Sequence, residues 1–142
     1  MIDILLVEDN PDHVILTRKV LEDNKVANKV YVATDGEDAI NFLYHRGKYS
    51  DGDSFPRPGL ILLDVKLPGI DGFGVLKRIK TDPDLRTIPI VMLTTSARDE
   101  ELSKGYSEGA NSYVTKPVRF NEFAEKVRSI GLYWGLINSS LY

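Results

Sequence analysis

The chain has 142 residues, of which 42% are hydrophobic and 27% are charged, a balance that favours one globular domain and excludes a disordered or membrane-spanning chain. Its 18 basic and 21 acidic residues give a net charge of -3, so nucleic acid and anionic membranes are not expected as partners. The absence of cysteine excludes disulfides, thiolate metal sites and cysteine nucleophiles.

The N-terminal run 2–7 is apolar but too short for a signal peptide or a membrane span, and it is predicted to be a strand. Either Asp9 or Asn10 can cap a following helix, and Pro11 suits its first turn. Residues at helical spacing then predict one inward-facing stripe, formed by His13, Leu16, Thr17, Val20 and Leu21. We expect a strand followed by a helix in a cytoplasmic protein.

The rest of the chain repeats this alternation. Strands are predicted over 29–34, 60–64, 88–95 and 112–117, helices over 35–46, 73–80, 98–109 and 119–130, and a polar, breaker-rich loop over 47–59. Five strands alternating with five helices predict an α/β fold, in which a doubly wound parallel sheet carries helices on both faces. Ligands of such sheets bind outside the carboxyl ends of the strands.

Polar side chains follow the predicted strands at those ends. They are Glu8, Asp9, Asp64, Thr94, Thr95, Ser96 and Lys116. Converging carboxylates repel one another unless a cation compensates, and an all-oxygen set suits Mg²⁺. Lys116 and the Thr94 hydroxyl could bind oxygens of a phosphoryl group. The composition of the site predicts phosphoryl transfer onto Asp64, the central carboxylate.

Four segments, in this order and spacing, resemble the receiver domain of two-component response regulators. They are LLVEDNPD, LILLDVKLPGIDGFGVLKRIK, IPIVMLTTSA and GANSYVTKPV. The resemblance covers essentially the whole chain, 1–142, as a single domain. It implies a CheY-like, flavodoxin-like (βα)5 fold with strand order 2-1-3-4-5.

The resemblance also implies roles for individual residues. Asp64 would accept a phosphoryl group from a sensor histidine kinase and would bind Mg²⁺ together with Glu8, Asp9 and the backbone carbonyl of Lys66. Thr94 would bond the phosphoryl group and move on activation, and Thr95 lies beside it in the same site. Lys116 would pair with the phosphoryl group and precede a cis proline, and Tyr113 would be the aromatic switch.

Such a protein is not an enzyme toward other molecules, because it catalyses only its own phosphorylation and dephosphorylation within a phosphorelay. Its signal would leave through contacts with a downstream protein. The alternative is an aspartate-nucleophile phosphatase or phosphotransferase of the haloacid dehalogenase type, whose DxD pattern is broken here by Lys66. The two histidines, His13 and His45, are not expected to take part in catalysis.

The loop 47–59 and the tail GLYWGLINSSLY resemble stand-alone regulators that partner phytochrome-type kinases, although the acidic residue expected after Trp134 is missing. We expect residues 129–142 to form a helical extension. Helical counting places Trp134 on the inward stripe and places Leu132 and Leu136 on the opposite face. That arrangement predicts a homodimer through the tail, and the alternative is a tail that folds back on its own domain.

Overall fold

The computed structural model describes residues 2–26, 29–96 and 98–136. Its elements in chain order are β1 (Ile4–Val7), α1 (Pro11–Asp23), β2 (Val30–Ala33), α2 (Gly36–Leu43), the 3-10 helix η1 (Gly47–Tyr49), β3 (Leu60–Asp64), α3 (Gly72–Lys80), β4 (Ile90–Thr94), α4 (Asp99–Ser107), β5 (Ser112–Thr115), α5 (Phe120–Ser129) and α6 (Tyr133–Leu136). The predicted strands and helices are all present, and most are shorter than predicted; β3 keeps the predicted bounds 60–64, and α3 begins one residue earlier than predicted, at Gly72.

The five strands form one parallel sheet in the order β2-β1-β3-β4-β5. This order confirms the predicted doubly wound α/β fold. In the sheet register Val7 lies beside Leu63, and Asp64 lies beside Leu93. The carboxyl ends of β1, β3 and β4 therefore meet at one edge, where parallel sheets bind their ligands.

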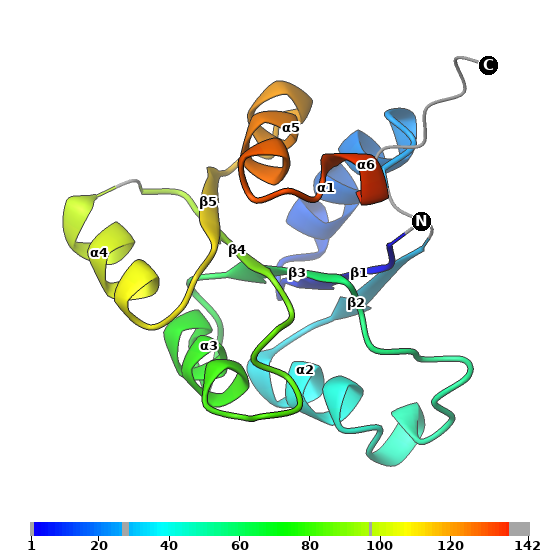
Figure 1. Cartoon of the computed structure of the whole chain (residues 1–142). Helices are drawn as coiled ribbons and strands as arrows, with labels where there is room; N and C mark the ends of the chain where they lie inside the picture. The colour runs from blue at the N-terminus through cyan, green and yellow to red at the C-terminus, as the bar shows by residue number, and fades with distance from the viewer. Residues whose placement is uncertain (1, 27–28, 97, 137–142) are drawn as a thin grey trace.

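Successive residues of each strand face opposite sides of the sheet, and each side has its own apolar core. One core joins Leu5, Ile61 and Met92 to α2 and α3, and the other joins Leu6, Leu62 and other strand residues to α1, α5 and α6. Figure 1 shows these two helix layers on opposite sides of the sheet. Both faces of the central strands are covered, which explains their continuous apolar sequences.

The structure corrects the predicted stripe of α1. Thr17 and Leu21 are buried as expected, but the side chain of Leu16 is 53% exposed. Leu16 is turned toward Pro117 and Val118 of the segment after β5, where it lines a groove and not the sheet interface. Helical periodicity predicted an inward Leu16 because the spacing of apolar residues does not show which other elements pack against each side of the helix.

The prediction of a continuous helical stripe in the tail is also wrong. Helix α5 ends at Ser129, the chain turns at Gly131 with a φ of 82°, and the short helix α6 follows. Helical counting across that turn has no meaning, because the rotation per residue is interrupted. The orientation of residues after Gly131 is instead set by the packing of α6.

The described part of the tail folds back on its own domain. The backbone N–H of Ile2 donates to the carbonyl of Gly135 at 2.8 Å, and Leu136 is fully buried. Leu132 and Tyr133 pack against the same core as α1 and α5. Among the apolar residues that motivated a tail-mediated dimer, Leu136 is buried and Ile130, Leu132 and Tyr133 are partly buried against this core. The side chain of Trp134, predicted on the inward stripe, lies outside the described residues, as do residues 137–142.

In the part of the chain that the structure describes, each helix is either too short or too polar to cross a lipid bilayer.

Candidate functional site

Three carboxylates meet at the carboxyl edge of the sheet. Glu8 follows β1, Asp9 comes next, and Asp64 ends the neighbouring strand β3. One oxygen from each of the three lies within 4.8 Å of the others. Glu8 and Asp64 are buried and Asp9 is exposed, so the cluster opens to solvent on one side. The structure thus brings together the three predicted carboxylates.

Local sequence fixes the chain on both sides of this cluster. The Asn10 side chain caps α1 by accepting from the N–H groups of Asp12 and His13, and Asp71 caps α3 by accepting from Gly74 N–H at 2.9 Å. Gly72 allows α3 to approach the end of β3 closely, because a Cβ atom there would collide with the backbone carbonyl of Asp64. These features hold both strand ends in place.

Lys116 brings a positive charge into the cluster from the segment after β5. Its backbone N–H donates to the carbonyl of Thr94 at 2.8 Å, and the Lys116–Pro117 peptide is cis, as predicted. The Lys116 ammonium forms an ion pair with Glu8 and donates to Asp64 Oδ2 at 3.0 Å. With 8% of its side chain exposed, this lysine is the internal counter-ion of the acidic cluster.

Burial raises the pKa of Glu8 above its ordinary value, the Lys116 hydrogen bond lowers it, and the nearby Asp64 raises it again. Burial is the largest of these effects, so the pKa of Glu8 lies above its ordinary value. Among the described residues, Oε1 of Glu8 accepts no hydrogen bond of normal geometry and meets Lys116 as a close ion pair. A buried carboxylate oxygen of this kind, beside two further carboxylates, suits a hard divalent cation.

A polar cleft of about 230 Å³ opens over the cluster. It is lined by Glu8, Asp9, Asn10, His13, Asp64, Val65, Lys66, Thr94, Thr95 and Lys116. The backbone N–H of Lys66 donates to Asp64 Oδ1 at 3.2 Å, while the Lys66 residue as a whole is exposed. The cleft leaves room beside Asp64 for a phosphoryl-sized group, and the predicted site residues Thr94 and Thr95 form part of its wall.

Thr94 lines the cleft at the end of β4, and Tyr113 lies on the neighbouring strand β5. The Thr94 hydroxyl donates to the carbonyl of Ser96 at 2.7 Å, so it is held within its own turn. Tyr113 is buried, and its hydroxyl donates to the carbonyl of Glu101 in α4 at 2.7 Å. Burial raises the pKa of Tyr113 to about 12, and the neighbouring Tyr106 and Glu101 add to the increase. Tyr113 thus links β5 to α4.

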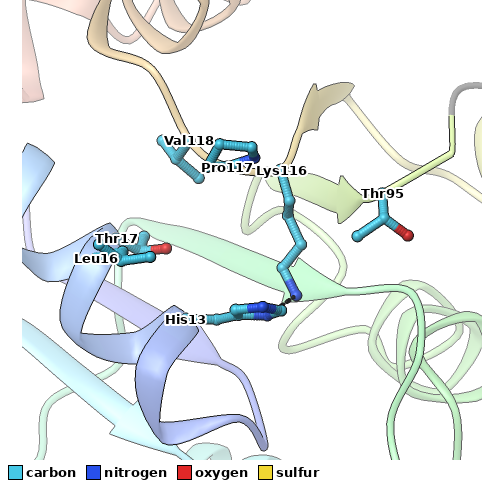
Figure 2. Close-up of a pocket in the computed structure, with 7 residues that line it drawn as sticks. All are labelled: His13, Leu16, Thr17, Thr95, Lys116, Pro117 and Val118. Atoms are coloured by element: carbon cyan, nitrogen blue, oxygen red, sulfur yellow. Dashed lines mark hydrogen bonds between the residues drawn. The ribbon is translucent and has the colours of Figure 1, made fainter.

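His13, which was not expected to take part, lies beside the site. Its Nδ1 atom is 3.0 Å from the Lys116 ammonium, and Figure 2 shows the lysine side chain reaching down to the imidazole ring. The same two residues line a neighbouring apolar groove of about 160 Å³ between α1 and the segment after β5. Helical periodicity alone could not reveal this contact, because the two residues are 103 positions apart in the sequence.

The chain matches the response regulator receiver domain family over residues 4–128. It is 41% identical over 132 residues to the probable methanogenesis regulatory protein FilR2 of Methanothrix harundinacea, covering 92% of this chain and 82% of that protein. It is 38% identical over 131 residues to the response regulator Rcp1 of Synechocystis, covering 92% of this chain and 87% of Rcp1.

Solved structures give the same result. The structure of the bacteriophytochrome response regulator AtBRR is 42% identical, with a TM-score of 0.86 and coverage of 98% of this chain and 99% of that one. The crystal structure of the Mn²⁺-bound form of Rcp1 is 37% identical, with a TM-score of 0.75 and coverage of 94% of each chain. The similarity therefore extends over fold and sequence together.

Proposed function

The chain belongs to the response regulator receiver domain family, and we propose that within this family Asp64 is the residue that accepts the phosphoryl group. Receiver domains are phosphorylated on an aspartate by histidine kinases and pass the signal to downstream proteins. The observation that supports Asp64 is its position: it ends the central strand, it opens into the polar cleft, and its Oδ2 accepts from Lys116 at 3.0 Å.

The proposed reaction needs little from the protein beyond alignment and charge neutralisation. A carboxylate oxygen of Asp64 attacks the phosphorus atom of a phosphohistidine in line. The P–N bond breaks, the histidine leaves as the neutral imidazole after taking up a proton, and an aspartyl phosphate forms. Lys116, already beside Asp64, neutralises negative charge on the transferred group. Water later hydrolyses the acyl phosphate and restores the carboxylate.

Receiver domains are signalling proteins, and we propose that this chain catalyses only its own phosphorylation and dephosphorylation. Lys66 occupies the position at which a haloacid dehalogenase would carry its second aspartate. The family match leaves no support for that alternative. Incubation with acetyl phosphate and Mg²⁺ tests the function, because a receiver carries at most one acyl phosphate per chain. Incubation with a phosphoester tests the alternative, and sustained release of inorganic phosphate from it would contradict the proposed function.

Receiver domains bind a divalent cation at an acidic pocket, and we propose that this cation is Mg²⁺. Glu8, Asp9 and Asp64 would hold it, together with the backbone carbonyl of Lys66 and water. The bound cation would neutralise charge on the phosphoryl oxygens during transfer. The convergence of three carboxylate oxygens within 4.8 Å, one of them a buried oxygen of Glu8, supports this assignment.

Replacement of Asp9 by alanine is expected to weaken Mg²⁺ binding, because the change removes a carboxylate from the solvent side of the cluster. Loss of an outer-shell partner alone costs roughly ten- to hundredfold in metal affinity, so loss of a direct ligand should cost at least about tenfold. Titration calorimetry measures the affinity. Asp84→Ala, an exposed carboxylate in the turn before β4, is the control and should bind as the wild type does. Equal affinities for Asp9→Ala and wild type would contradict the assignment.

We propose that Thr94 and Tyr113 couple phosphorylation to the output surface, with Thr95 at the rim of the same cleft. To reach a phosphoryl group, the Thr94 hydroxyl must give up its bond to the Ser96 carbonyl. The Tyr113 hydroxyl holds the first turns of α4 through Glu101. A shift of Thr94 would therefore change the connection from β4 to α4, and Tyr113 contacts the start of α4 through its hydrogen bond to Glu101.

Replacement of Gly105 by alanine is expected to expel Tyr113 from its buried position. A Cβ atom at residue 105 would collide with the Tyr113 hydroxyl, and the end of that side chain is the part free to move. Helix α4 itself should survive, since alanine is a better helix former than glycine by about 1 kcal/mol. In the variant the pKa of Tyr113 should fall from about 12 toward the ordinary value of 10.0.

NMR of Cζ-labelled tyrosine, assigned with Tyr113→Phe, measures that pKa. Gly52→Ala serves as the control because its added Cβ meets nothing closer than 3.6 Å. A Tyr113 pKa that stays near 12 in Gly105→Ala would mean that α4 moves away and the tyrosine does not.

We propose a sensor histidine kinase of the phytochrome class as the phosphoryl donor, supported by the similarity to the response regulator AtBRR. ATP-dependent phosphorylation of that kinase would take place in the cytoplasm, where we propose that this protein also acts. The chain covers most of the length of FilR2 and Rcp1, which supports a regulator that works as a stand-alone receiver.

We also propose that residues 1–142 form one receiver domain with 129–142 as its C-terminal extension. Because α6 covers its own domain, a homodimer through the tail would have to use residues beyond Leu136 or the outer face of α6. Sedimentation with and without phosphorylation tests for such a dimer.

A further inference from the structure

Lys116 is held at the site by three side chains, and one of them has no part in the roles proposed above. The ammonium meets Glu8 and Asp64 on one side and Nδ1 of His13, at 3.0 Å, on the other. His13 lies in the first turn of α1, whose start is fixed by the Asn10 cap. Figure 2 shows the ring of His13 directly at the end of the Lys116 side chain.

The chemistry of the two groups decides which atom donates. An ammonium has only donors, so Nδ1 of His13 must be the acceptor and the ring must be neutral, with its proton on Nε2. The competing arrangement is a protonated ring paired with Oε1 of Glu8 at 3.6 Å. We favour the first arrangement, because Lys116 lies closer to His13 and to Glu8 than these two lie to each other.

His13 differs from the other two partners of Lys116 in what phosphorylation does to them. Under the proposed function, Glu8 becomes a metal ligand and Asp64 becomes an acyl phosphate, so neither remains a free carboxylate for the lysine. Nδ1 of His13 is unchanged by either event. The phosphoryl oxygens then become partners of the ammonium, and His13 Nδ1 is the one side-chain acceptor of the three that still fixes the direction of this long, flexible lysine.

We propose that His13 is a positioning residue for Lys116, and that its Nδ1 atom keeps the ammonium beside residue 64 while the phosphoryl group is present. This inference rests on the proposed function of Asp64 and Lys116. His13 touches neither phosphorus nor the attacking oxygen and acts only through the lysine. His13 thus contributes to phosphoryl binding from α1, outside the strand-end loops.

Two substitutions separate hydrogen bonding from packing. His13→Asn keeps an acceptor, because its Oδ1 is bonded to Cγ as Nδ1 is in histidine. His13→Leu removes the acceptor and keeps an apolar side chain of useful size in the half-buried position. Leu16→Ala is the control for disturbance of the neighbouring groove, since Leu16 lines that groove and is 53% exposed. Thermal unfolding establishes that all three variants are folded.

The first measurement is the affinity for beryllofluoride, a non-covalent substitute for the phosphoryl group, determined by calorimetry with Mg²⁺ present. His13→Leu should bind it about tenfold more weakly than wild type, because one hydrogen bond to a charged group is lost. His13→Asn and Leu16→Ala should stay within about twofold of wild type. The second measurement is ¹⁵N NMR of the imidazole without metal, where Nδ1 of His13 should be unprotonated and should shift on Lys116→Met.

Wild-type affinity in His13→Leu, or an equal loss in His13→Asn and His13→Leu, would overturn the inference. An Nδ1 signal that does not respond to Lys116→Met would also overturn it. A wild-type protein that binds no beryllofluoride and forms no acyl phosphate would overturn the proposed function and this inference with it. Only the first three outcomes leave the proposed function standing.

Discussion

Asp64→Asn is expected to abolish phosphorylation of the protein by acetyl phosphate. The neutral amide oxygen is a poor nucleophile, and no other carboxylate of the cluster ends the central strand. The fold should remain intact, because asparagine has the same shape and retains an oxygen that can accept from Lys116 at the position of Asp64 Oδ2. Intact-mass spectrometry at neutral pH, before hydrolysis of the acyl phosphate, measures the loss of the phosphoryl adduct.

Asp53→Asn is the matched control, since Asp53 is an exposed carboxylate in the loop before β3. That variant should take up phosphate to the wild-type level. A stoichiometric adduct on Asp64→Asn would contradict the assignment of the acceptor, and peptide mapping would then show whether Glu8 or Asp9 carries the group. Both lie in the same cluster, so this experiment discriminates among all three carboxylates.

Leu136→Ala is expected to lower the free energy of unfolding by roughly 2–5 kcal/mol, because Leu136 is fully buried in the core shared with α1 and α5. Against a total stability of about 5–15 kcal/mol, this is a large loss for a residue at the end of a short helix. Urea denaturation measures it. The site should still phosphorylate at low temperature, because Ile2, just before the start of β1, bonds Gly135 of α6, whereas the cleft lies after the carboxyl ends of the strands. Figure 1 shows α6 near the N-terminus.

Ile15→Ala is the control, since Ile15 is 64% exposed on α1 and its truncation should change stability by no more than about 0.5 kcal/mol. If Leu136→Ala also left the free energy of unfolding unchanged, α6 would not pack on its own domain in solution. The tail would then be available for a partner. A change in oligomeric state without a change in monomer stability would identify a second copy as that partner.

The two variants address different ends of the same sheet. Asp64 depends on strand ends, helix caps and the Lys116 counter-ion, whereas Leu136 depends on a turn at Gly131 and on the backbone bond from Ile2 to Gly135. Phosphorylation at the carboxyl ends of the strands and the packing of α6 near the start of β1 can therefore be changed independently. Mutations more than about 7–10 Å apart with no shared partners usually have additive effects on stability.

The sequence by itself determined the alternation of strands and helices, because fully buried strands have continuous apolar runs and the helices are bounded by caps. It also determined that Glu8, Asp9, Asp64 and Lys116 would meet, because parallel strands bring their carboxyl ends to one edge. The cis peptide before Pro117 and the burial of Tyr113 agree with the resemblance to receiver domains.

Tertiary structure alone decided three further features. Leu16 is exposed and not inward, because the neighbours of α1 determine which side of the helix is covered. Leu136 is buried because the turn at Gly131 interrupts the helical rotation on which a periodic count depends. His13 contacts Lys116 across 103 positions of sequence, and a contact between two distant side chains leaves no local pattern to detect.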